Sequence, residues 1–161
     1  MPQTIIVTGV SSGVGAATAK AFSLRGDQVF GLARHASSRE DLNNLGVKLI
    51  DTDLSDDESV DNAMSIIKSQ TNHIDVLASV AGVAINGSIE EVSIEQAETQ
   101  LQVNVLGVAR LIKSVLPIMR QQKHGRIIVV TSSVVYATYP LLGWYAGSKR
   151  AIEGGFRCIK A

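Results

Sequence analysis

The chain has 161 residues, and 15 lysines and arginines balance 15 aspartates and glutamates, so the formal net charge is zero. Hydrophobic residues make up 45 % of the chain, which excludes a disordered protein and allows one domain with a sizeable core. A neutral chain without a basic run does not suit nucleic acid as its main partner. The single cysteine excludes a disulfide framework and a metal site built from several cysteines.

No targeting signal stands out in the sequence. Residues 1–4 lead directly into an apolar segment, without the charged region and cleavage site of a secretory signal. No apolar run approaches the roughly 18 residues that cross a membrane. Repeats and linkers are also missing, so we expect a single cytoplasmic domain over residues 1–161.

The first third of the chain alternates short β-branched segments with helical patterns. Strands are expected over residues 4–8, 28–33 and 47–51, and helices over 14–24 and 39–45. Gly26 follows the first of these helices as a stop signal, and Ser38 is a candidate cap for the second.

The remainder of the chain continues this alternation. Strands are expected over residues 74–78 and 126–131, and helices over 55–70, from Ser93 onward, over 105–119 and from Tyr145 to the end of the chain. Ser55-Asp-Asp-Glu58 fits a capping box. The helix capped by Ser93 either continues past Asn104 or breaks near it. The helix over 105–119 is apolar nearly all round, so we expect it to be buried in the fold or against another subunit. The whole pattern predicts an α/β fold, a parallel sheet with helices on both faces.

The first strand is followed by a glycine-rich turn, which reads Thr8-Gly-Val-Ser-Ser-Gly-Val-Gly15. Gly9 would let the chain turn sharply, Gly13 would let a pyrophosphate approach the backbone, and Gly15 would let helix and strand pack closely. The helix that begins here offers free N–H groups to phosphates. An ordinary tight turn would also fit. If the turn does bind phosphates, the residues between these glycines belong to the same site: Ser11, Ser12 and Val14.

Tyr145-Ala-Gly-Ser-Lys149 places a phenol and an ammonium four residues apart, on one face of the last helix. An ammonium beside a phenol favours the phenolate, so such a tyrosine can exchange a proton with a substrate oxygen near neutral pH. A tyrosine and a lysine at this spacing are common by chance, so the pair needs support from other segments.

Several blocks together resemble the short-chain dehydrogenase/reductase family in the family's own order, over essentially the whole chain. They are the T-G-x-x-x-G-x-G turn, an aspartate-hydrophobe pair at Asp53, an N-x-x-G helix at Asn104 and the Y-x-x-x-K pair. The resemblance implies a Rossmann-like doubly wound sheet and an oxidoreductase that moves a hydride between a nicotinamide cofactor and a carbonyl or secondary alcohol.

The end of the second strand bears on the choice of cofactor. An NAD site places an acidic residue here for the ribose 2′-OH, but this strand ends with Ala33-Arg34. Arg34 could pair with a 2′-phosphate and stack on adenine, so NADP is favoured over NAD. A solvent-facing arginine is the alternative. The resemblance adds Asp53, for the adenine amino group, and Leu54, Ala81 and Gly82 along the cofactor, although Asp53 could equally cap a helix.

The resemblance also supplies the catalytic residues. Counting seven residues from Gly125 and thirteen back from Tyr145 selects Ser132 rather than its neighbour Ser133. The family uses this serine to hold the substrate oxygen, the tyrosine to move the proton and the lysine to tune the tyrosine and bind the nicotinamide ribose. At the position that matches Asn104, the family has an asparagine that interrupts a helix and holds a water molecule of the proton relay.

Two features depart from the family. Ser79 and Val80 replace the usual asparagines after the fourth strand; Ser79 could keep one hydrogen bond, but Val80 cannot. The chain also stops at Ala161, before two further strands and a substrate loop, so the C-terminal strands of the sheet are missing. One edge of the fifth strand is then expected to lie bare, where another chain could pair with it.

Two functions remain from this reading. The first is an NADP-dependent dehydrogenase or reductase with a small carbonyl or alcohol substrate. A weak similarity to hydroxysteroid and retinol dehydrogenases suggests that this substrate is apolar. The second is a truncated nucleotide-binding module without turnover, or an incomplete part of an active longer protein. The resemblance implies a homodimer or homotetramer, joined through the helices at 105–119 and from Tyr145 onward. No metal site is predicted.

Overall fold

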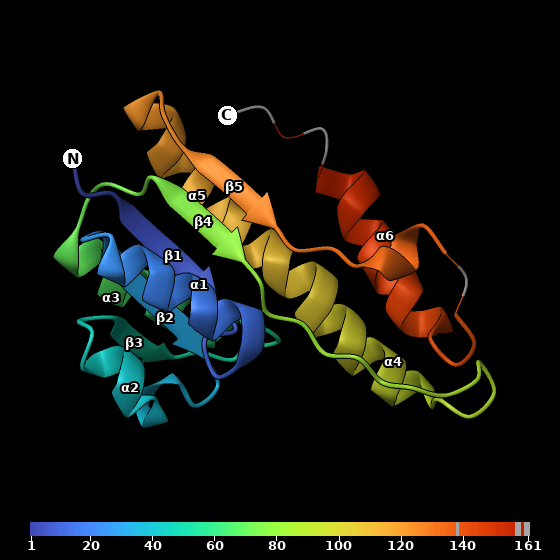
Figure 1. The fold of residues 1–161 in the computed structure, drawn as a ribbon. Coiled ribbons are helices and arrows are strands. Elements are labelled where there is room, and N and C mark those ends of the chain that lie inside the picture. Colours follow the sequence, from blue (N-terminus) through green and yellow to red (C-terminus); the bar gives the residue numbers. More distant parts are fainter. Residues whose placement is uncertain (138, 157–158, 160–161) are drawn as a thin grey trace.

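The computed structural model describes residues 1–137, 139–156 and 159. Within them, five parallel strands form one sheet in the order β3-β2-β1-β4-β5 (Figure 1). The strands are β1 (Thr4–Thr8), β2 (Gln28–Ala33), β3 (Lys48–Asp51), β4 (Val76–Ser79) and β5 (Arg126–Val129). The predicted Rossmann-like α/β sheet is confirmed, with β3 and β5 shorter than the sequence suggests and β4 slightly later.

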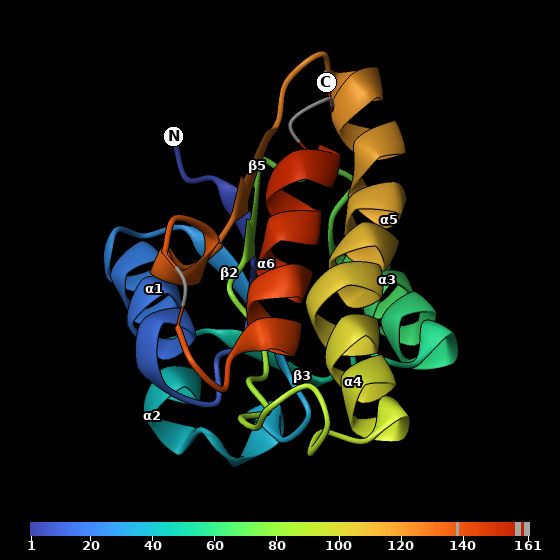
Figure 2. The same ribbon diagram turned by 90° about the vertical axis from the view of Figure 1, so that its right-hand side faces the viewer.

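Helices cover both faces of this sheet, as an edge-on view shows (Figure 2). One face carries α1 (Gly13–Leu24) and α2 (Glu40–Asn43), and the other carries α3 (Asp57–Gln70) and α5 (Gly107–Gln122). Alternate strand residues serve the two faces: Val7 and Val29 join the first core cluster, while Ile6 and Phe30 join the second. The last described helix, α6 (Gly143–Phe156), stands beside the edge strand β5.

The central strand β1 determines where a ligand can bind. All five of its residues are buried, because its β-branched side chains are suited to both covered faces. It pairs with β2 on one side and with β4 on the other, since the chain returns across the sheet after β3. In open parallel sheets, ligands bind at the carboxyl ends of the strands where the order reverses, which here means β1 and β4.

Two predicted helix caps are wrong. The N-cap of α2 is Arg39, and Ser38 instead ends a short 3₁₀ turn. The N-cap of α3 is Asp56, whose carboxylate accepts hydrogen bonds from two N–H groups of the first turn. Ser55 does not cap that helix because its own N–H and hydroxyl groups are bound to Asp53. The 3₁₀ turns are η1 (Ala36–Ser38) and η3 (Ser133–Val135).

The longest helical segment joins α4 (Ile94–Leu101), a π-helical turn (Gln102–Leu106) and α5. Ser93 caps α4, as predicted, and its side chain forms a capping box with Gln96 that was not predicted. By length and composition alone, the whole segment Ile94–Gln122, with 29 residues, could cross a membrane, whereas the sequence analysis found no apolar run of that length. That is weak evidence, because a helix packed in a protein core passes the same test. In this structure α5 places Leu111, Val115 and other apolar side chains in the core over the sheet.

Residues 105–119 are not buried all round within this chain, and burial of their exposed side against another subunit stays a prediction. α5 buries one stripe of residues against the sheet, whereas Leu106, Lys113 and Pro117 are exposed. An amphipathic helix of this kind needs only one neighbouring surface to bury its apolar side.

The last helix begins at Gly143 and is described to Phe156. Ile159 is not helical, so the helix does not continue unbroken to the end of the chain. Ala161 and Cys158 lie outside the described residues.

Candidate active site

The turn between β1 and α1 leaves no room for side chains at two of its glycines. Gly9 has a φ of +76°, and a Cβ there would lie 2.9 Å from the Cα of Ala81. A Cβ on Gly15 would lie 2.2 Å from the carbonyl oxygen of Gly9 and 2.9 Å from that of Thr8. The first turn of α1 therefore packs directly on the backbone at the end of β1, which only glycine permits.

The amino end of α1 has backbone donors without a side-chain partner. Ser12 is the N-cap, but its side chain makes no capping hydrogen bond, and no acidic residue lies in the first turn. Gly13 has nothing within 4 Å of its Cβ position, so this end of the helix is open. Free N–H groups, an open glycine and the positive end of the helix dipole fit an anionic phosphate. The pyrophosphate of a nicotinamide dinucleotide fits this cradle.

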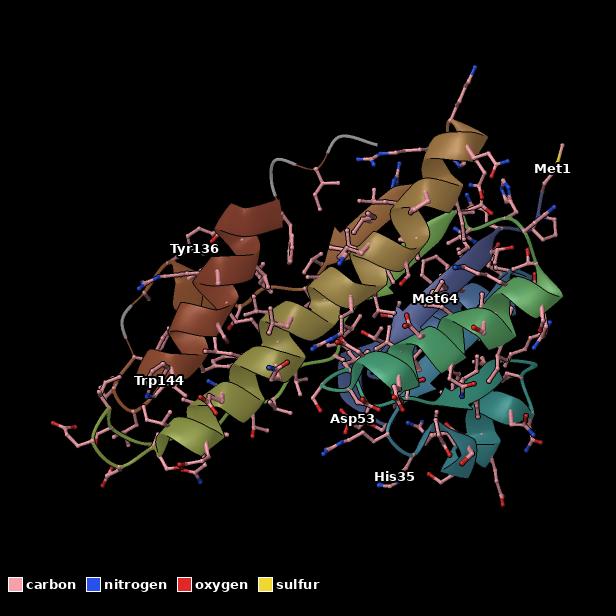
Figure 3. The ribbon with its side chains drawn as sticks, turned by 180° about the vertical axis from the view of Figure 1, so that it is seen from behind. Met1, His35, Asp53, Met64, Tyr136 and Trp144 are labelled. Atoms are coloured by element: carbon pink, nitrogen blue, oxygen red, sulfur yellow. The ribbon has the colours of Figure 1, made fainter. Side chains whose placement is uncertain are left out.

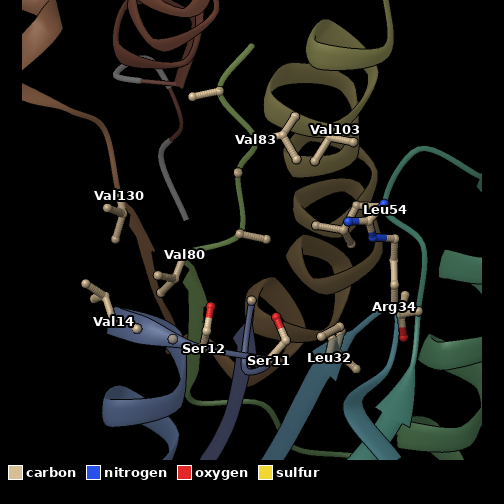
Figure 4. A pocket seen from close by; sticks show the side chains of 18 of the residues that line it. Ser11, Ser12, Val14, Leu32, Arg34, Leu54, Val80, Val83, Val103 and Val130 are labelled. Atoms are coloured by element: carbon tan, nitrogen blue, oxygen red, sulfur yellow. The ribbon is translucent and has the colours of Figure 1, made fainter. Parts of the chain in front are cut away.

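The turn opens into a cavity of about 380 Å³ at the carboxyl ends of the strands. Ser11, Ser12 and Val14 lie at its base in Figure 4, with Val130 and Arg34 on opposite sides. Of the predicted site residues, those that line it are Gly9, Ser11, Ser12, Gly13, Val14, Gly15, Arg34, Asp53, Leu54, Ala81, Gly82, Tyr145 and Lys149. The cavity thus brings the predicted cofactor residues and two predicted catalytic residues together.

Arg34 and Asp53 form the charged side of the cavity. Arg34 is exposed at the end of β2, and its guanidinium lies beside Leu54 (Figure 4). The carboxylate of Asp53 accepts hydrogen bonds from the hydroxyl (2.6 Å) and the N–H (2.8 Å) of Ser55. These hydrogen bonds, and then the charge of Arg34, hold the pKa of Asp53 below its ordinary value. Asp53 therefore fixes the loop after β3 rather than capping α3.

Thr8 stabilises the segment where the asparagines of the family are missing. Its hydroxyl oxygen accepts hydrogen bonds from the N–H groups of Val80 (3.0 Å) and Ala81 (2.9 Å). The hydroxyl of Ser79 is buried without a hydrogen-bond partner among the described residues, so the suggestion that Ser79 keeps one hydrogen bond is wrong. The threonine at the end of β1 thus ties down the backbone that follows β4.

Lys149 lies one helical turn after Tyr145 on α6 and is only 3 % exposed. Its Nζ donates to the carbonyl oxygen of Val130 (3.0 Å) and lies 5.9 Å from the centroid of the Tyr145 ring. Burial lowers the pKa of Lys149 below its ordinary value. A Cβ on Gly82 would lie 3.2 Å from this Nζ, so the glycine leaves room for the ammonium at the cavity wall.

Asn104 lies in the π-helical turn, where the helix neither ends nor continues regularly. Its side chain is fully buried and bridges two segments of the site. The amide oxygen accepts from the N–H of Val83 (2.8 Å), and the amide nitrogen donates to the carbonyl of Val83 (2.8 Å) and to the hydroxyl of Ser148 (3.0 Å). Asn104 therefore joins the loop after β4 to the residue that precedes Lys149, from a position outside the cavity lining.

Ser132 also lies outside the lining of the cavity, whereas its neighbour Thr131 is part of it. The hydroxyl of Ser132 accepts a hydrogen bond from the N–H of Val134 (3.4 Å) and caps the 3₁₀ turn after β5. Of the four predicted catalytic residues, the structure places only Tyr145 and Lys149 at the cavity.

Sequence reasoning missed one charged residue beside the glycine turn. Arg39 donates from Nη1 to the carbonyl of Val10 (2.7 Å), while its other nitrogens pair with Asp41 (2.7 and 2.8 Å). No spacing rule connects Arg39 with a turn 29 residues earlier. The rule that carboxyl ends of parallel strands form the ligand crevice would have found other missed lining residues: Leu32, Thr52, Val130 and Thr131.

Comparison with known proteins agrees with this arrangement. The family model described as short chain dehydrogenase matches residues 3–161. The chain belongs to the short-chain dehydrogenase family. A relative named 3-ketodihydrosphingosine reductase, from Bacteroides thetaiotaomicron, is 37 % identical over 154 residues, which make up 95 % of this chain and 55 % of that protein.

Solved structures of this family share the fold. A short-chain dehydrogenase from Streptomyces avermitilis has a TM-score of 0.92 and 29 % identity, covering 97 % of this chain and 58 % of that one. An alcohol dehydrogenase from Thermococcus sibiricus, complexed with 5-hydroxy-NADP, has a TM-score of 0.89 and 28 % identity, covering 98 % of this chain and 69 % of that one. The chain spans about half the length of the curated relatives that it matches.

Proposed function

We propose that this chain carries the cofactor site and the proton-transfer residues of an NADP-dependent oxidoreductase that acts on a carbonyl or a secondary alcohol. The observation that supports this most is that Tyr145 and Lys149 line the same cavity as the uncapped amino end of α1. One part of the cavity fits a phosphate, and another part holds a group that can move a proton.

The cofactor would be held by the backbone of the glycine turn and by the hydroxyls of Ser11 and Ser12. When bound, a nicotinamide dinucleotide would supply the hydride to a carbonyl carbon, or accept it from an alcohol carbon. Arg34 supports NADP over NAD, because a guanidinium suits a 2′-phosphate and β2 ends without an acidic residue. The Thermococcus sibiricus relative, whose structure contains an NADP derivative, supports the same choice.

Tyr145 would move the proton. During reduction, its phenolic O–H bond breaks as an O–H bond forms on the substrate oxygen, and during oxidation the proton returns to the phenol. Lys149 would keep a positive charge beside the phenol, held in place by the carbonyl of Val130. Asn104 would act through its bridge between Val83 and Ser148, which positions α6 and therefore both of these side chains.

A second candidate is a module that binds NADP without turnover. One observation favours it: Ser132 lies outside the lining of the cavity. In a homodimer or homotetramer, the exposed side of α5 would be covered by another subunit. Such assembly is compatible with both candidate functions.

Two measurements, of cofactor binding and of turnover, distinguish the two candidate functions. NADPH and NADH binding would be measured by fluorescence titration, beside NADPH oxidation with a panel of ketones. We expect Arg34→Ala to weaken NADPH binding about tenfold and to leave NADH binding unchanged, since a charge-assisted contact is lost. Tyr145→Phe should abolish turnover while NADPH still binds. Binding without turnover in the unaltered chain supports the module, and no binding of either cofactor overturns both candidates.

A further inference from the structure

The guanidinium of Arg110, near the beginning of α5, contacts three other segments of the chain. Its Nη1 donates to the carbonyl oxygen of Leu54 (3.2 Å), in the loop after β3. Its Nη2 donates to the side-chain oxygen of Gln102 (3.0 Å), and Nη1 also donates to the backbone carbonyl of that residue (3.4 Å). Its Nε pairs with Asp57, the first residue of α3. Arginine suits this position because its planar group presents several N–H donors in a fixed arrangement.

Two of these segments line the cavity at the carboxyl ends of the strands. Leu54 belongs to the lining, and so does Val103 in the π-helical turn. Figure 3 shows Asp53, the residue before Leu54, where α3 begins beside the long helical segment. Arg110 is not itself among the lining residues. It therefore joins two parts of one cavity wall from a position outside the cavity.

This wall lies at one end of the cavity. The side chain of Leu54 lies beside Arg34 and away from Val130 in Figure 4. Arg34 is the residue that would pair with the 2′-phosphate of NADP, which is attached to the adenosine ribose. The proposed proton-transfer residues are instead near Val130, whose carbonyl accepts a hydrogen bond from Lys149. The wall therefore faces the adenosine half of the proposed cofactor.

Close backbone packing places the Leu54 carbonyl within reach of Arg110. A Cβ on Gly107 would lie 2.6 Å from this carbonyl oxygen and 2.8 Å from the Cβ of Leu54. Gly107 and Arg110 are three residues apart, so they lie on the same face of α5. Leu54 is only 6 % exposed, so water does not easily replace a donor that its carbonyl loses. The loop after β3 is therefore packed on α5 at the glycine and bonded to it by the arginine.

The other hydrogen bonds of Arg110 go to the π-helical turn. Gln102 is the first residue of this turn, and its carbonyl also accepts from the N–H of Gly107, five residues later. Turns of this kind interrupt the regular α-helical pattern and are frequent at functional sites. Asn104, which bridges the loop after β4 to α6, lies in the same turn. Arg110 therefore contacts both the turn that carries Asn104 and the loop that carries Leu54.

We infer that Arg110 is a positioning residue for the cofactor, which keeps Leu54 against the π-helical turn so that the adenosine half of a nicotinamide dinucleotide meets a preformed wall. The inference rests on the proposed function, because it requires this cofactor in the cavity. The ion pair with Asp57 is not the basis of the role, since Asp57 is 76 % exposed and exposed pairs contribute little. Without the hydrogen bonds to Leu54 and Gln102, the loop would have to be ordered when the cofactor binds, and this ordering weakens binding.

Three variants test this role. Arg110→Met keeps a long side chain but removes every donor, and Arg110→Lys keeps the charge and a donor for one carbonyl. Asp57→Asn is the matched control, because it removes the ion pair and leaves the hydrogen bonds of Arg110 to Leu54 and Gln102 in place. NADPH and NADH binding would be titrated by fluorescence. Adenosine 2′,5′-bisphosphate, which carries the adenosine half of NADP without the nicotinamide, would be titrated by calorimetry.

We expect Arg110→Met to weaken the binding of all three ligands about tenfold, because each of them contains adenosine. This pattern differs from that of Arg34→Ala, which should weaken NADPH binding and leave NADH binding unchanged. Arg110→Lys should lose about threefold for each ligand, since it regains one of the hydrogen bonds. Asp57→Asn should bind all three ligands like the unaltered chain.

Unchanged affinities for all three ligands in Arg110→Met, together with a lower urea midpoint, would overturn the inference and leave Arg110 a structural residue. Equal losses in Asp57→Asn would also overturn it, because the ion pair would then be the cause. If Arg110→Met does not fold, unchanged affinities in Arg110→Lys have the same meaning.

These titrations read cofactor binding alone and need no turnover. A chain whose binding depends on Arg110 but which never oxidises NADPH contradicts the proposed reaction and not this role. Turnover together with unchanged binding in Arg110→Met contradicts the role and leaves the proposed reaction intact.

Discussion

Strands β1 and β5 belong to the same parallel sheet, yet their surroundings are opposite. All five residues of β1 are buried, whereas all four residues of β5 are exposed or half-buried. β1 pairs on both sides, while β5 pairs only with β4 among the described residues. The proposed cofactor site therefore follows a strand that is buried and paired on both sides. Val130, whose carbonyl oxygen accepts a hydrogen bond from Lys149, instead follows a strand at the edge of the sheet.

The largest effect that tests this comparison is expected from truncating core side chains. Leu111 is fully buried on α5, and Ile128 on β5 is 42 % exposed. We expect Leu111→Ala to lower the free energy of unfolding by about 2–5 kcal/mol. Ile128→Ala should cost less than about 1 kcal/mol, because little of that side chain leaves water on folding. Urea denaturation of both variants checks this, and similar losses would show that β5 is covered in solution.

A glycine pair gives the second test, with effects of opposite sign. Gly15→Ala should destabilise the chain by about 1–3 kcal/mol, because its Cβ would meet the carbonyl oxygen of Gly9 at 2.2 Å and neither backbone can move freely. Gly147 lies in α6 with nothing within 4 Å of its Cβ position. Gly147→Ala should therefore stabilise the chain by up to about 1 kcal/mol through helix propensity. Thermal and urea unfolding measure both, and a stable Gly15→Ala would contradict the packing of the turn.

The sequence predicts the closed region better than the open one. β1 and β2 are predicted residue for residue, and β1 is an uninterrupted β-branched run, which has few alternatives to a buried strand. β5 ends two residues earlier than its apolar run, since strand ends depend on partners that a local pattern does not contain. The cap of α3 was misplaced for a similar reason: Asp53 takes the hydrogen bonds of Ser55 and leaves Asp56 at the helix end.

The site divides in the same way. The spacing of Tyr145 and Lys149 places them on one helix face, and both do line the cavity. The hydrogen bonds of Thr8 to Val80 and Ala81 join residues more than seventy positions apart, which no spacing rule anticipates. The orientation of Ser132 depends on a 3₁₀ turn that the sequence does not announce.

The other edge of the sheet provides a smaller, pH-dependent test. Beyond β3, the hydrogen bonds of Ser55 and the charge of Arg34 lower the pKa of Asp53 in the folded chain. Because the unfolded pKa is higher, about 3.9, the carboxylate stabilises the fold above that pH, and this stabilisation is lost as the pH falls through the folded pKa.

Asp53→Asn should therefore lower the free energy of unfolding by about 1 kcal/mol at pH 7, and by progressively less as the pH falls below about 4. Urea denaturation of both chains at pH 7, 5, 4 and 3 gives the difference at each pH. A difference that stays constant over this range would mean that the ionised carboxylate contributes nothing beyond the shape of its side chain.

The smallest effect on stability is expected from Ile128→Lys, at the open edge. Because Ile128 already contacts water, the lysine should change the free energy of unfolding by less than about 0.5 kcal/mol. Its charge should instead oppose pairing of β5 with a strand of another chain, as charged side chains do on natural edge strands. Static light scattering over a range of chain concentrations should show weaker self-association than in the unaltered chain.

Leu24→Lys adds the same charge at the end of α1, away from the sheet edge, and serves as the control. If both variants reduce association equally, net charge is the cause and β5 is not the contact. If neither variant reduces association, the unpaired edge of β5 is not the surface through which the chain associates.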